Sequence, residues 1–166
     1  MILPDFLAPG LDIIFCGTAA GRISAQRGHY YANPGNRFWS FLAETGLTPQ
    51  KLRPCEDNQI NRFALGLTDL AKTAFGQDAM IPQQAWDAPG LWLKIVAQAP
   101  RTLAFTSLTA ARLALGRPLV KAGQLDPNPL LPNVDLWALP SPSGLARSHF
   151  SAEPWHNMAI WVKAAR

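Results

Sequence analysis

Four short apolar runs alternate along the chain with segments in which apolar positions recur at helical spacing. The runs are rich in branched and aromatic side chains, which is typical of buried strands. The first stops at Gly17, and Asp69 directly follows the second, so polar or small residues stand where each strand is expected to end. The predicted strands cover residues 11–16, 63–68, 102–106 and 134–139.

The segments between and after these runs predict helices. Asn36 is a suitable N-cap for a helix that starts at residue 37 and is ended by Gly46, and Ser107 is a suitable cap for residues 108–115. A short helix is expected to start at Thr48 and to finish before Pro54. Two further helices are predicted over residues 91–99 and 155–165.

Strands that alternate with helices favour parallel pairing through right-handed crossovers. We therefore expect an α/β fold, a single-domain three-layer sandwich over residues 1–166 with a short four-stranded parallel sheet flanked by helices. The carboxyl ends of parallel strands gather loops at one edge, where such sheets bind ligands. The positions expected to meet there are Gly17, Asp69, Ser107 and Ser141.

The charge balance suits a polyanionic partner such as DNA without requiring one. The chain carries a net charge of +4 and has a pI near 9.4, although only 16% of its residues are charged. Cys16 lies in an apolar run and Cys55 in a polar stretch, with no paired-cysteine spacing. This argues against a zinc site, an iron–sulfur cluster and a disulfide framework, so we expect no metal and no cofactor.

The compartment is expected to be the reducing cytoplasm, and the chain is expected to be a monomer. The first ten residues are apolar but contain Pro4, Asp5 and Pro9 and have no basic leader, so a signal peptide is not expected. No apolar run reaches the length that spans a membrane.

Two small-residue loops, residues 17–21 and 139–144, follow predicted strands and are the leading candidates for a site. Glycine lets a backbone approach a ligand closely and turn its N–H groups toward anionic oxygen. Small hydroxyl residues add hydrogen-bond donors without filling the pocket. Neither loop needs this composition merely to reverse the chain.

Several fragments in order resemble the uracil-DNA glycosylase superfamily, and most closely its mismatch-specific uracil-DNA glycosylases. The resemblance implies hydrolysis of the N-glycosidic bond of a damaged or mismatched base that is flipped out of DNA. It covers most of the domain, and the order and spacing of the fragments are more specific than any one alone. The fragments are residues 7–11, 15–17, 24–25, 31–34, 36–39, 66–68 and 142–145, together with Arg147.

The resemblance assigns a base pocket and a DNA-binding loop. Tyr31 matches the aromatic residue that stacks on uracil, although a packed core tyrosine is the alternative. Leu145 matches the leucine that wedges into the duplex, or else anchors its loop on the core, and Arg147 matches a neighbouring DNA contact. Further base-binding candidates are Phe15, Thr18, Ser24 and Asn33, and further DNA-binding candidates are Ser141, Ser143 and Gly144.

The residue that activates water departs from the family pattern. Aligned on Gly17 and Gly21, the family's asparagine falls at Ala19, which has no polar group. Asp69 is the best replacement, because it follows the second predicted strand at the same edge and a carboxylate there can orient water and stabilise an oxocarbenium-like sugar. The alternative is that Asp69 caps a following helix.

The sequence therefore predicts a monofunctional DNA glycosylase that removes uracil, preferentially from U·G mismatches, in base excision repair. Because the usual amide is missing at Ala19, a protein that binds lesions without cutting is one alternative. A hypoxanthine-preferring glycosylase is a second alternative. A nucleoside hydrolase on a similar sheet is a third, and it would not need a duplex.

Overall fold

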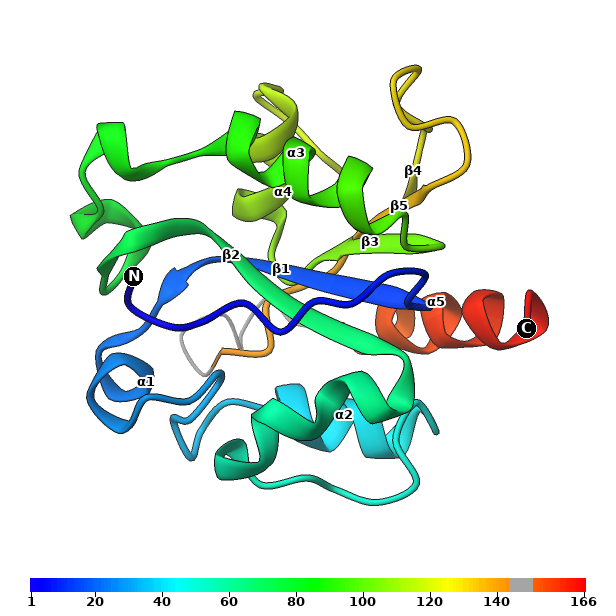
Figure 1. The fold of residues 1–166 in the computed structure, drawn as a ribbon, viewed down its shortest axis with the longest axis horizontal. Coiled ribbons are helices and arrows are strands. Elements are labelled where there is room, and N and C mark those ends of the chain that lie inside the picture. Colours follow the sequence, from blue (N-terminus) through cyan, green and yellow to red (C-terminus); the bar gives the residue numbers. More distant parts are fainter. Residues whose placement is uncertain (144–150) are drawn as a thin grey trace.

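A five-stranded mixed sheet forms the centre of the protein in a computed structural model, which describes residues 1–143 and 151–166 (Figure 1). The strand order is β2-β1-β3-β5-β4. The pairings of β1 with β2, β1 with β3 and β3 with β5 are parallel, and β4 runs antiparallel to β5. The strands are β1 (Ile13–Ala20), β2 (Leu65–Phe75), β3 (Thr102–Phe105), β4 (Gly123–Leu125) and β5 (Asp135–Ala138).

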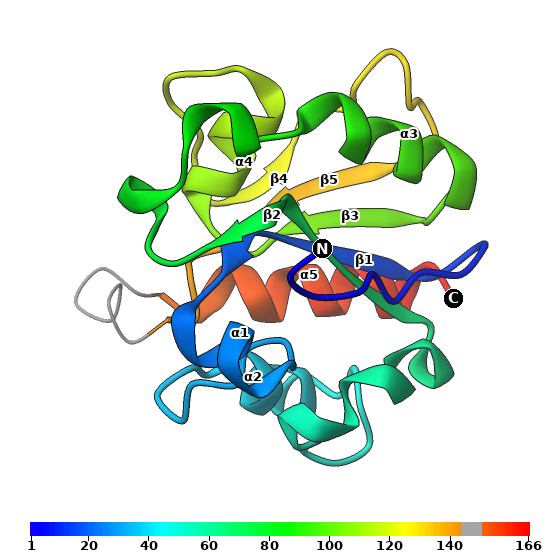
Figure 2. The ribbon, with the colours of Figure 1, turned by 60° about the vertical axis from the view of Figure 1, so that its left-hand side comes forward.

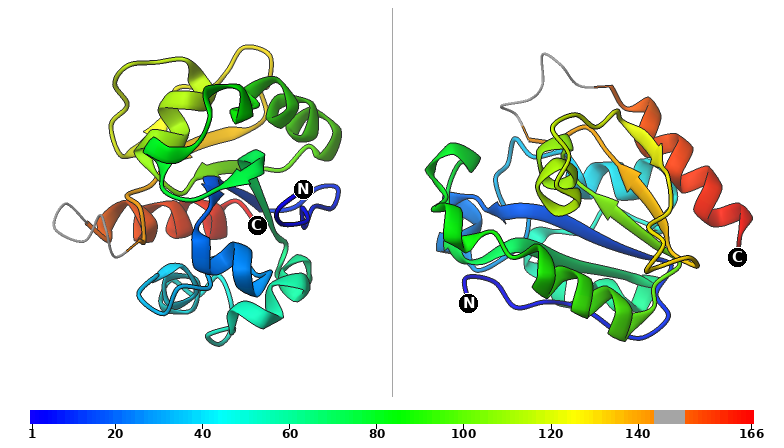
Figure 3. Two further views of the ribbon diagram at one scale, coloured as in Figure 1. Left: turned by 90° about the vertical axis from the view of Figure 1, so that its left-hand side faces the viewer. Right: turned by 90° about the horizontal axis from the view of Figure 1, so that it is seen from above.

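Helices cover both faces of this sheet, which gives the three layers seen in Figures 2 and 3. One layer contains α3 (Ala88–Gln98) and α4 (Leu108–Leu115). The other contains α1 (Arg22–Arg27), α2 (Phe38–Glu44), the 3-10 helix η1 (Pro54–Phe63) and α5 (Glu153–Ala164). Two short 3-10 helices, η2 (Asp78–Met80) and η3 (Gln83–Ala85), follow β2.

The central strand β1 shows why its sequence is a continuous apolar run. Ile13 and Phe15 belong to the apolar cluster on the α2 and α5 side, whereas Ile14 and Cys16 belong to the cluster on the α3 and α4 side. Successive side chains of a strand point to opposite faces, and here both faces are covered by helices. An apolar residue is therefore needed at every position.

The predicted α/β class is confirmed in its main features, and so is one of the two predicted helix caps. The backbone N–H of Ala110 donates to Ser107 Oγ (3.0 Å), so Ser107 caps α4 as expected. The predicted Asn36 cap is wrong, because α2 starts at Phe38 and its N-cap is Arg37. Asn36 lies one residue earlier, and its side chain accepts a hydrogen bond from the backbone N–H of Phe38 (2.9 Å).

Two predicted features of the architecture are wrong. The sheet has five strands and is mixed, because β4 adds an antiparallel edge that is only three residues long and contains a glycine. The region from Thr48 to Arg53 holds no helix, and Pro54 instead begins the 3-10 helix η1. A proline fits the first turn of such a helix because its missing N–H would have no partner there.

Two strands also run farther than the apolar pattern predicts. β1 continues past Gly17 to Ala20, and β2 continues past Thr68 to Phe75, so Asp69 lies inside a strand. No helix in the described ranges, 1–143 and 151–166, combines the length and apolar character needed to cross a membrane.

Candidate active site

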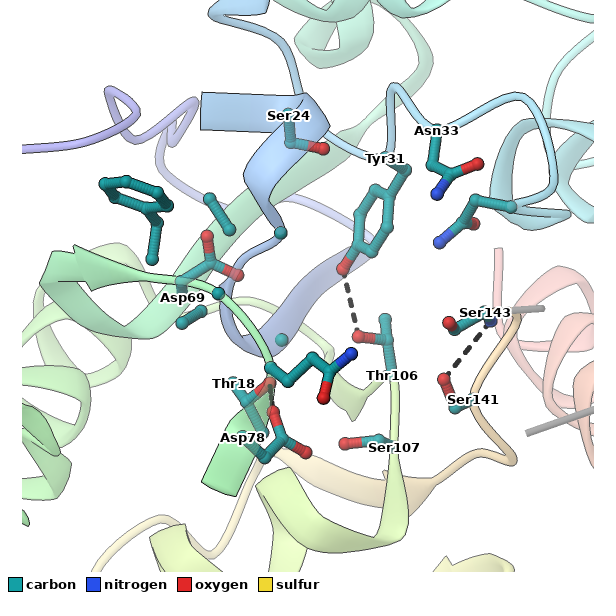
Figure 4. A pocket seen from close by; sticks show the side chains of 18 of the residues that line it. Thr18, Ser24, Tyr31, Asn33, Asp69, Asp78, Thr106, Ser107, Ser141 and Ser143 are labelled. Atoms are coloured by element: carbon teal, nitrogen blue, oxygen red, sulfur yellow. Dashed lines mark hydrogen bonds between the residues drawn. The ribbon is translucent and has the colours of Figure 1, made fainter. Parts of the chain in front are cut away.

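A pocket of about 930 Å³ lies at the carboxyl edge of the sheet. Gly17, Asp69, Ser107 and Ser141 all line it, as the parallel topology predicts for residues near the ends of four strands. Figure 4 shows Asp69, Tyr31 and Ser141 around its wall, contributed by segments far apart in the sequence. The topology of the sheet therefore assembles the site.

Gly17 leaves space for three side-chain oxygens at one point of this pocket. A Cβ atom on Gly17 would lie 2.7 Å from Asp69 Oδ1, 3.2 Å from Tyr31 Oη and 3.3 Å from Thr106 Oγ1. The first separation is too short for any real Cβ contact, so a side chain at position 17 would displace the carboxylate. The glycine is required here for close approach rather than for an unusual backbone conformation.

Asp69 is held opposite Gly17 by the pairing of β1 with β2, and only 6% of its surface is exposed. Because β2 continues through this position, the predicted alternative of a helix cap is wrong. No residue in the described part of the chain donates a hydrogen bond to its carboxylate. Burial raises the pKa of Asp69 to about 6, a rise that Lys72 and Lys94 oppose and Asp5 reinforces.

A network of charged groups lies beside Asp69. The Asp5 carboxylate accepts from Lys72 Nζ (2.9 Å), Lys94 Nζ (2.8 Å) and Thr68 Oγ1 (2.8 Å). Burial alone would raise the pKa of Asp5, but the two lysines and the threonine hold it below its ordinary value. The same network holds Lys72 beside Asp5 and the Tyr30 hydroxyl (3.0 Å).

Tyr31 is fixed in place by contacts with its ring and its hydroxyl. Its ring stacks on Phe38 with centroids 4.0 Å apart and an angle of 21° between the planes. Its hydroxyl is hydrogen-bonded to Thr106 Oγ1 (2.9 Å), as Figure 4 shows. Burial raises the pKa of Tyr31 well above its ordinary value, so the phenol stays protonated.

Phe15, which the sequence offers as a base-binding candidate, does not line the pocket. Its side chain is fully buried and does not line the pocket. It packs edge-on against Phe38 with ring centroids 5.2 Å apart, and Phe38 supports Tyr31. The alternation of β1 explains this, since Phe15 points into the α2 and α5 layer.

The other base-binding candidates line the pocket, and each has a local partner. Thr18 Oγ1 donates to Asp78 Oδ1 (2.6 Å), and Ser24 Oγ accepts from the backbone N–H of Ala32 (3.0 Å). Asn33 Oδ1 accepts from the N–H of Gly35 (2.9 Å), which leaves the amide NH₂ of this exposed residue available as a donor.

The second predicted loop also reaches the pocket. Ser141 and Ser143 line it, and Ser141 Oγ accepts from the Ser143 N–H (3.2 Å). The Arg37 N–H donates to the Pro142 carbonyl (2.9 Å), which ties the loop to the start of α2. The remaining predicted DNA contacts, Gly144, Leu145 and Arg147, lie outside the described residues.

Several pocket residues were not assigned a role from the sequence. Thr106 lies at the end of β3 and lines the pocket. The predicted strand indicated a loop at this point, but it did not indicate that this side chain would take part in the site. The residues at and after the end of β2 were not expected to reach the site, because the second strand was predicted to end at residue 68. The pocket residues missed are Phe75 at the end of β2, Asp78 and Met80 after it, and Arg112 of α4. Among the described residues, no three or more His, Cys, Asp or Glu side chains are grouped so that they could hold a metal ion.

Comparison with known proteins identifies the family. A family model described as the uracil DNA glycosylase superfamily matches residues 4–165. The chain belongs to the uracil DNA glycosylase superfamily. The resemblance in the sequence fragments is thereby confirmed at the level of the superfamily, and this membership supports a DNA glycosylase with DNA as its partner.

A solved structure supports the same fold for this superfamily member. It is the solution NMR structure of a candidate uracil DNA glycosylase from Methanosarcina acetivorans, with a TM-score of 0.63 and 21% sequence identity. The match covers 98% of this chain and 95% of that one. At this identity the likeness concerns the arrangement of the sheet and helices.

Proposed function

We propose that this protein flips uracil out of DNA, preferentially from U·G mismatches, and hydrolyses its N-glycosidic bond without a metal or cofactor. The observation that supports this proposal most strongly is the buried Asp69 carboxylate in the pocket. A buried carboxylate without a hydrogen-bond donor destabilises a fold, and this one lines the pocket at the carboxyl edge of the sheet. Its position and raised pKa suit a general base.

The reaction requires a base pocket and a group near the sugar. Water attacks the sugar C1′, the C1′–N bond breaks, and its electron pair leaves with the base. In the proposed mechanism the Asp69 carboxylate orients this water, accepts its proton and stabilises the positive charge that develops on the sugar. A general base of this kind contributes roughly 10²–10⁴-fold to a rate. With a pKa of about 6, Asp69 is mostly ionised at neutral pH.

Tyr31 is the proposed platform for the flipped base. Phe38 packs on the ring of Tyr31, and Tyr31 lines the pocket, so the face turned away from Phe38 is the one a base can stack on. The hydrogen bond to Thr106 fixes the tilt of the ring before any ligand binds. Stacking of a base on an aromatic ring is worth roughly 1–3 kcal/mol.

The decisive experiment is a single-turnover activity panel. Protein in excess is incubated with duplexes that contain U·G, U·A, T·G, hypoxanthine or xanthine, and abasic sites are detected by alkaline cleavage. We expect the fastest cleavage for U·G and a loss of at least 100-fold in Asp69→Asn. A loss below tenfold would leave too little for a general base to explain.

The panel also tests the alternatives. Ala19 lines the pocket with a methyl group, so this side chain cannot orient water. Tight binding of U·G duplexes without abasic product would favour a lesion-binding protein. Cleavage of hypoxanthine alone would redirect the substrate assignment, and cleavage of a free nucleoside would indicate a nucleoside hydrolase.

A further inference from the structure

Two large apolar side chains stand exposed at the pocket. Phe75 is 49% exposed and Met80 is 74% exposed, and both line the pocket. The other large exposed apolar residues of the described chain do not line it, and they include Leu93 and Leu119. We call Phe75 and Met80 the apolar rim.

The segment that carries the apolar rim is anchored to the core. The Gly76 N–H donates to the Ala20 carbonyl (2.8 Å), and the Thr18 hydroxyl donates to Asp78 (2.6 Å). Ile81, directly after Met80, is buried and holds the far end of the segment. The exposure of the rim therefore comes from a fixed backbone that directs these side chains outward.

Local geometry brings the two side chains of the rim together at one place. Gly76 has a φ of +124°, and a Cβ atom on it would lie 3.9 Å from Met80 Cβ, so the turn places Met80 close to the residue that follows Phe75. Asp78, within the same turn, lies on a different side of the pocket from Ser141 and Ser143 (Figure 4). The rim and the serine loop thus approach the pocket from separate directions.

The pocket also contains positive charge suited to a nucleic acid strand. Arg22 and Arg112 line it together with the rim. Arginine beside phosphate and an apolar side chain beside a base are the two kinds of contact that hold an unstacked strand. Polar neighbours such as Gln77 and Asp78 do not extend the apolar surface into a broad patch of the kind that protein interfaces use.

We propose that the apolar rim packs against the nucleobase next to the flipped nucleotide, an inference that rests on the function proposed above. Flipping a nucleotide leaves its neighbouring bases without a stacking partner, and each then exposes an apolar face. The Phe75 ring and the Met80 thioether cover such a face and stabilise the opened strand. The rim thereby acts on substrate binding rather than on bond cleavage.

The test uses the variants Phe75→Ser and Met80→Gln, singly and together, on the full chain. The substrates are U·G duplexes with 2-aminopurine beside the uracil, and binding is measured on the same duplex with the non-cleavable 2′-fluoro-2′-deoxyuridine. We expect the double variant to bind the analogue 10–100-fold more weakly and to change the 2-aminopurine fluorescence. The rate at saturating DNA should fall less than the affinity does, because the rim contacts the neighbouring base and not the bond that breaks.

Matched controls separate the rim from exposed apolar residues in general. Leu93→Ser and Leu119→Gln should leave analogue binding and fluorescence unchanged. The variant Phe75→Trp with Met80→Leu keeps apolar surface and should restore binding. The thermal unfolding midpoint of each variant checks that the fold is intact, and the single variants serve if the double variant is unstable.

Two outcomes would overturn the inference. One is unchanged analogue binding and fluorescence in the folded variants. The other is an equal loss of affinity for a duplex without uracil, which would make the rim a general DNA contact. If the wild type cleaves no base in the activity panel, the proposed function fails, while binding of the analogue duplex still measures the rim by itself.

Discussion

At the scale of single residues, the buried carboxylates Asp69 and Asp57 differ in whether they accept hydrogen bonds from the protein. Asp57 accepts the Tyr30 N–H (2.9 Å) and contacts His29 Nδ1 (3.2 Å), so its burial is compensated. The described residues offer Asp69 no such donor. A group left uncompensated in this way is expected where a ligand or water will supply the missing partner.

Asp69→Asn should therefore stabilise the protein while it lowers the single-turnover rate at least 100-fold. The folded-state pKa of Asp69 is about 6 against an ordinary value of 3.8, so its ionisation destabilises the fold progressively as pH rises through this interval. Above pH 6, removal of this charge should raise the free energy of unfolding by about 1–3 kcal/mol, after allowance for the cost of burying an amide. Urea unfolding at pH 4, 6 and 8 measures it.

Asp57→Asn is the matched control for the direction of this change in stability. Asp57→Asn should lower the free energy of unfolding, because it weakens the contacts to Tyr30 and His29. The gain for Asp69→Asn should be small at pH 4, where the wild-type carboxyl is already protonated. Equal destabilisation by the two substitutions at pH 8 would contradict the view that Asp69 is uncompensated.

At the scale of elements, the strands and most helices could be predicted because both faces of the sheet are covered and the caps are local. The apolar run of β1 and the Ser107 cap of α4 are signals of this kind. The site was only partly predictable. Gly17 and Asp69 interrupt the apolar pattern inside strands, since the site needs space and charge there, so they appeared to end the strands.

Other features could not be predicted because nothing local encodes them. The edge strand β4 has only three residues and lacks an apolar pattern, and it forms only because β5 lies beside it. The pairing of Tyr31 with Thr106 joins residues 75 positions apart. The burial of the Phe15 side chain in the layer of α2 and α5 could not be predicted either, because the face that each strand position presents depends on the helices that cover it.

The N-terminal segment is an element whose charge reaches the site, and Asp5→Asn tests its influence. Phe6 forms a bridge with Leu67 of β2, and Asp5 lies between the ammonium groups of Lys72 and Lys94. Without this negative charge the pKa of Asp69 should fall, since Asp5 raises it and the lysines lower it. The wild-type rate should decline below about pH 6, and the variant's decline should begin at a lower pH.

Single-turnover rates from pH 4.5 to 8 measure this shift. Asp12→Asn is the control, because Asp12 pairs with Arg166 (2.7 Å) at the end of β1 away from the pocket. It should leave the pH profile where it is. A shift of the acid limb to higher pH in Asp5→Asn would contradict the proposed electrostatic coupling.

At the scale of the whole molecule, the net charge of +4 is less informative than where the cations lie. Arg101 and Arg166 both pair with the Asp12 carboxylate at the amino end of β1. Arg22 and Arg112 line the pocket at the carboxyl end. Arg22 and Arg112 are therefore placed to contact a strand that enters the pocket, whereas Arg101 and Arg166 lie at the opposite edge of the sheet.

This distribution predicts how DNA binding depends on salt. Each phosphate neutralised by a cation contributes a slope of about −0.9 to log K against log salt for duplex DNA. Arg22→Gln and Arg112→Gln should each make the slope for the U·G analogue duplex shallower by about one, whereas Arg101→Gln should not change it. Anisotropy titrations between 50 and 300 mM salt measure the slopes. Equal effects of all three substitutions would mean that net charge, rather than the arginines of the pocket, attracts the DNA.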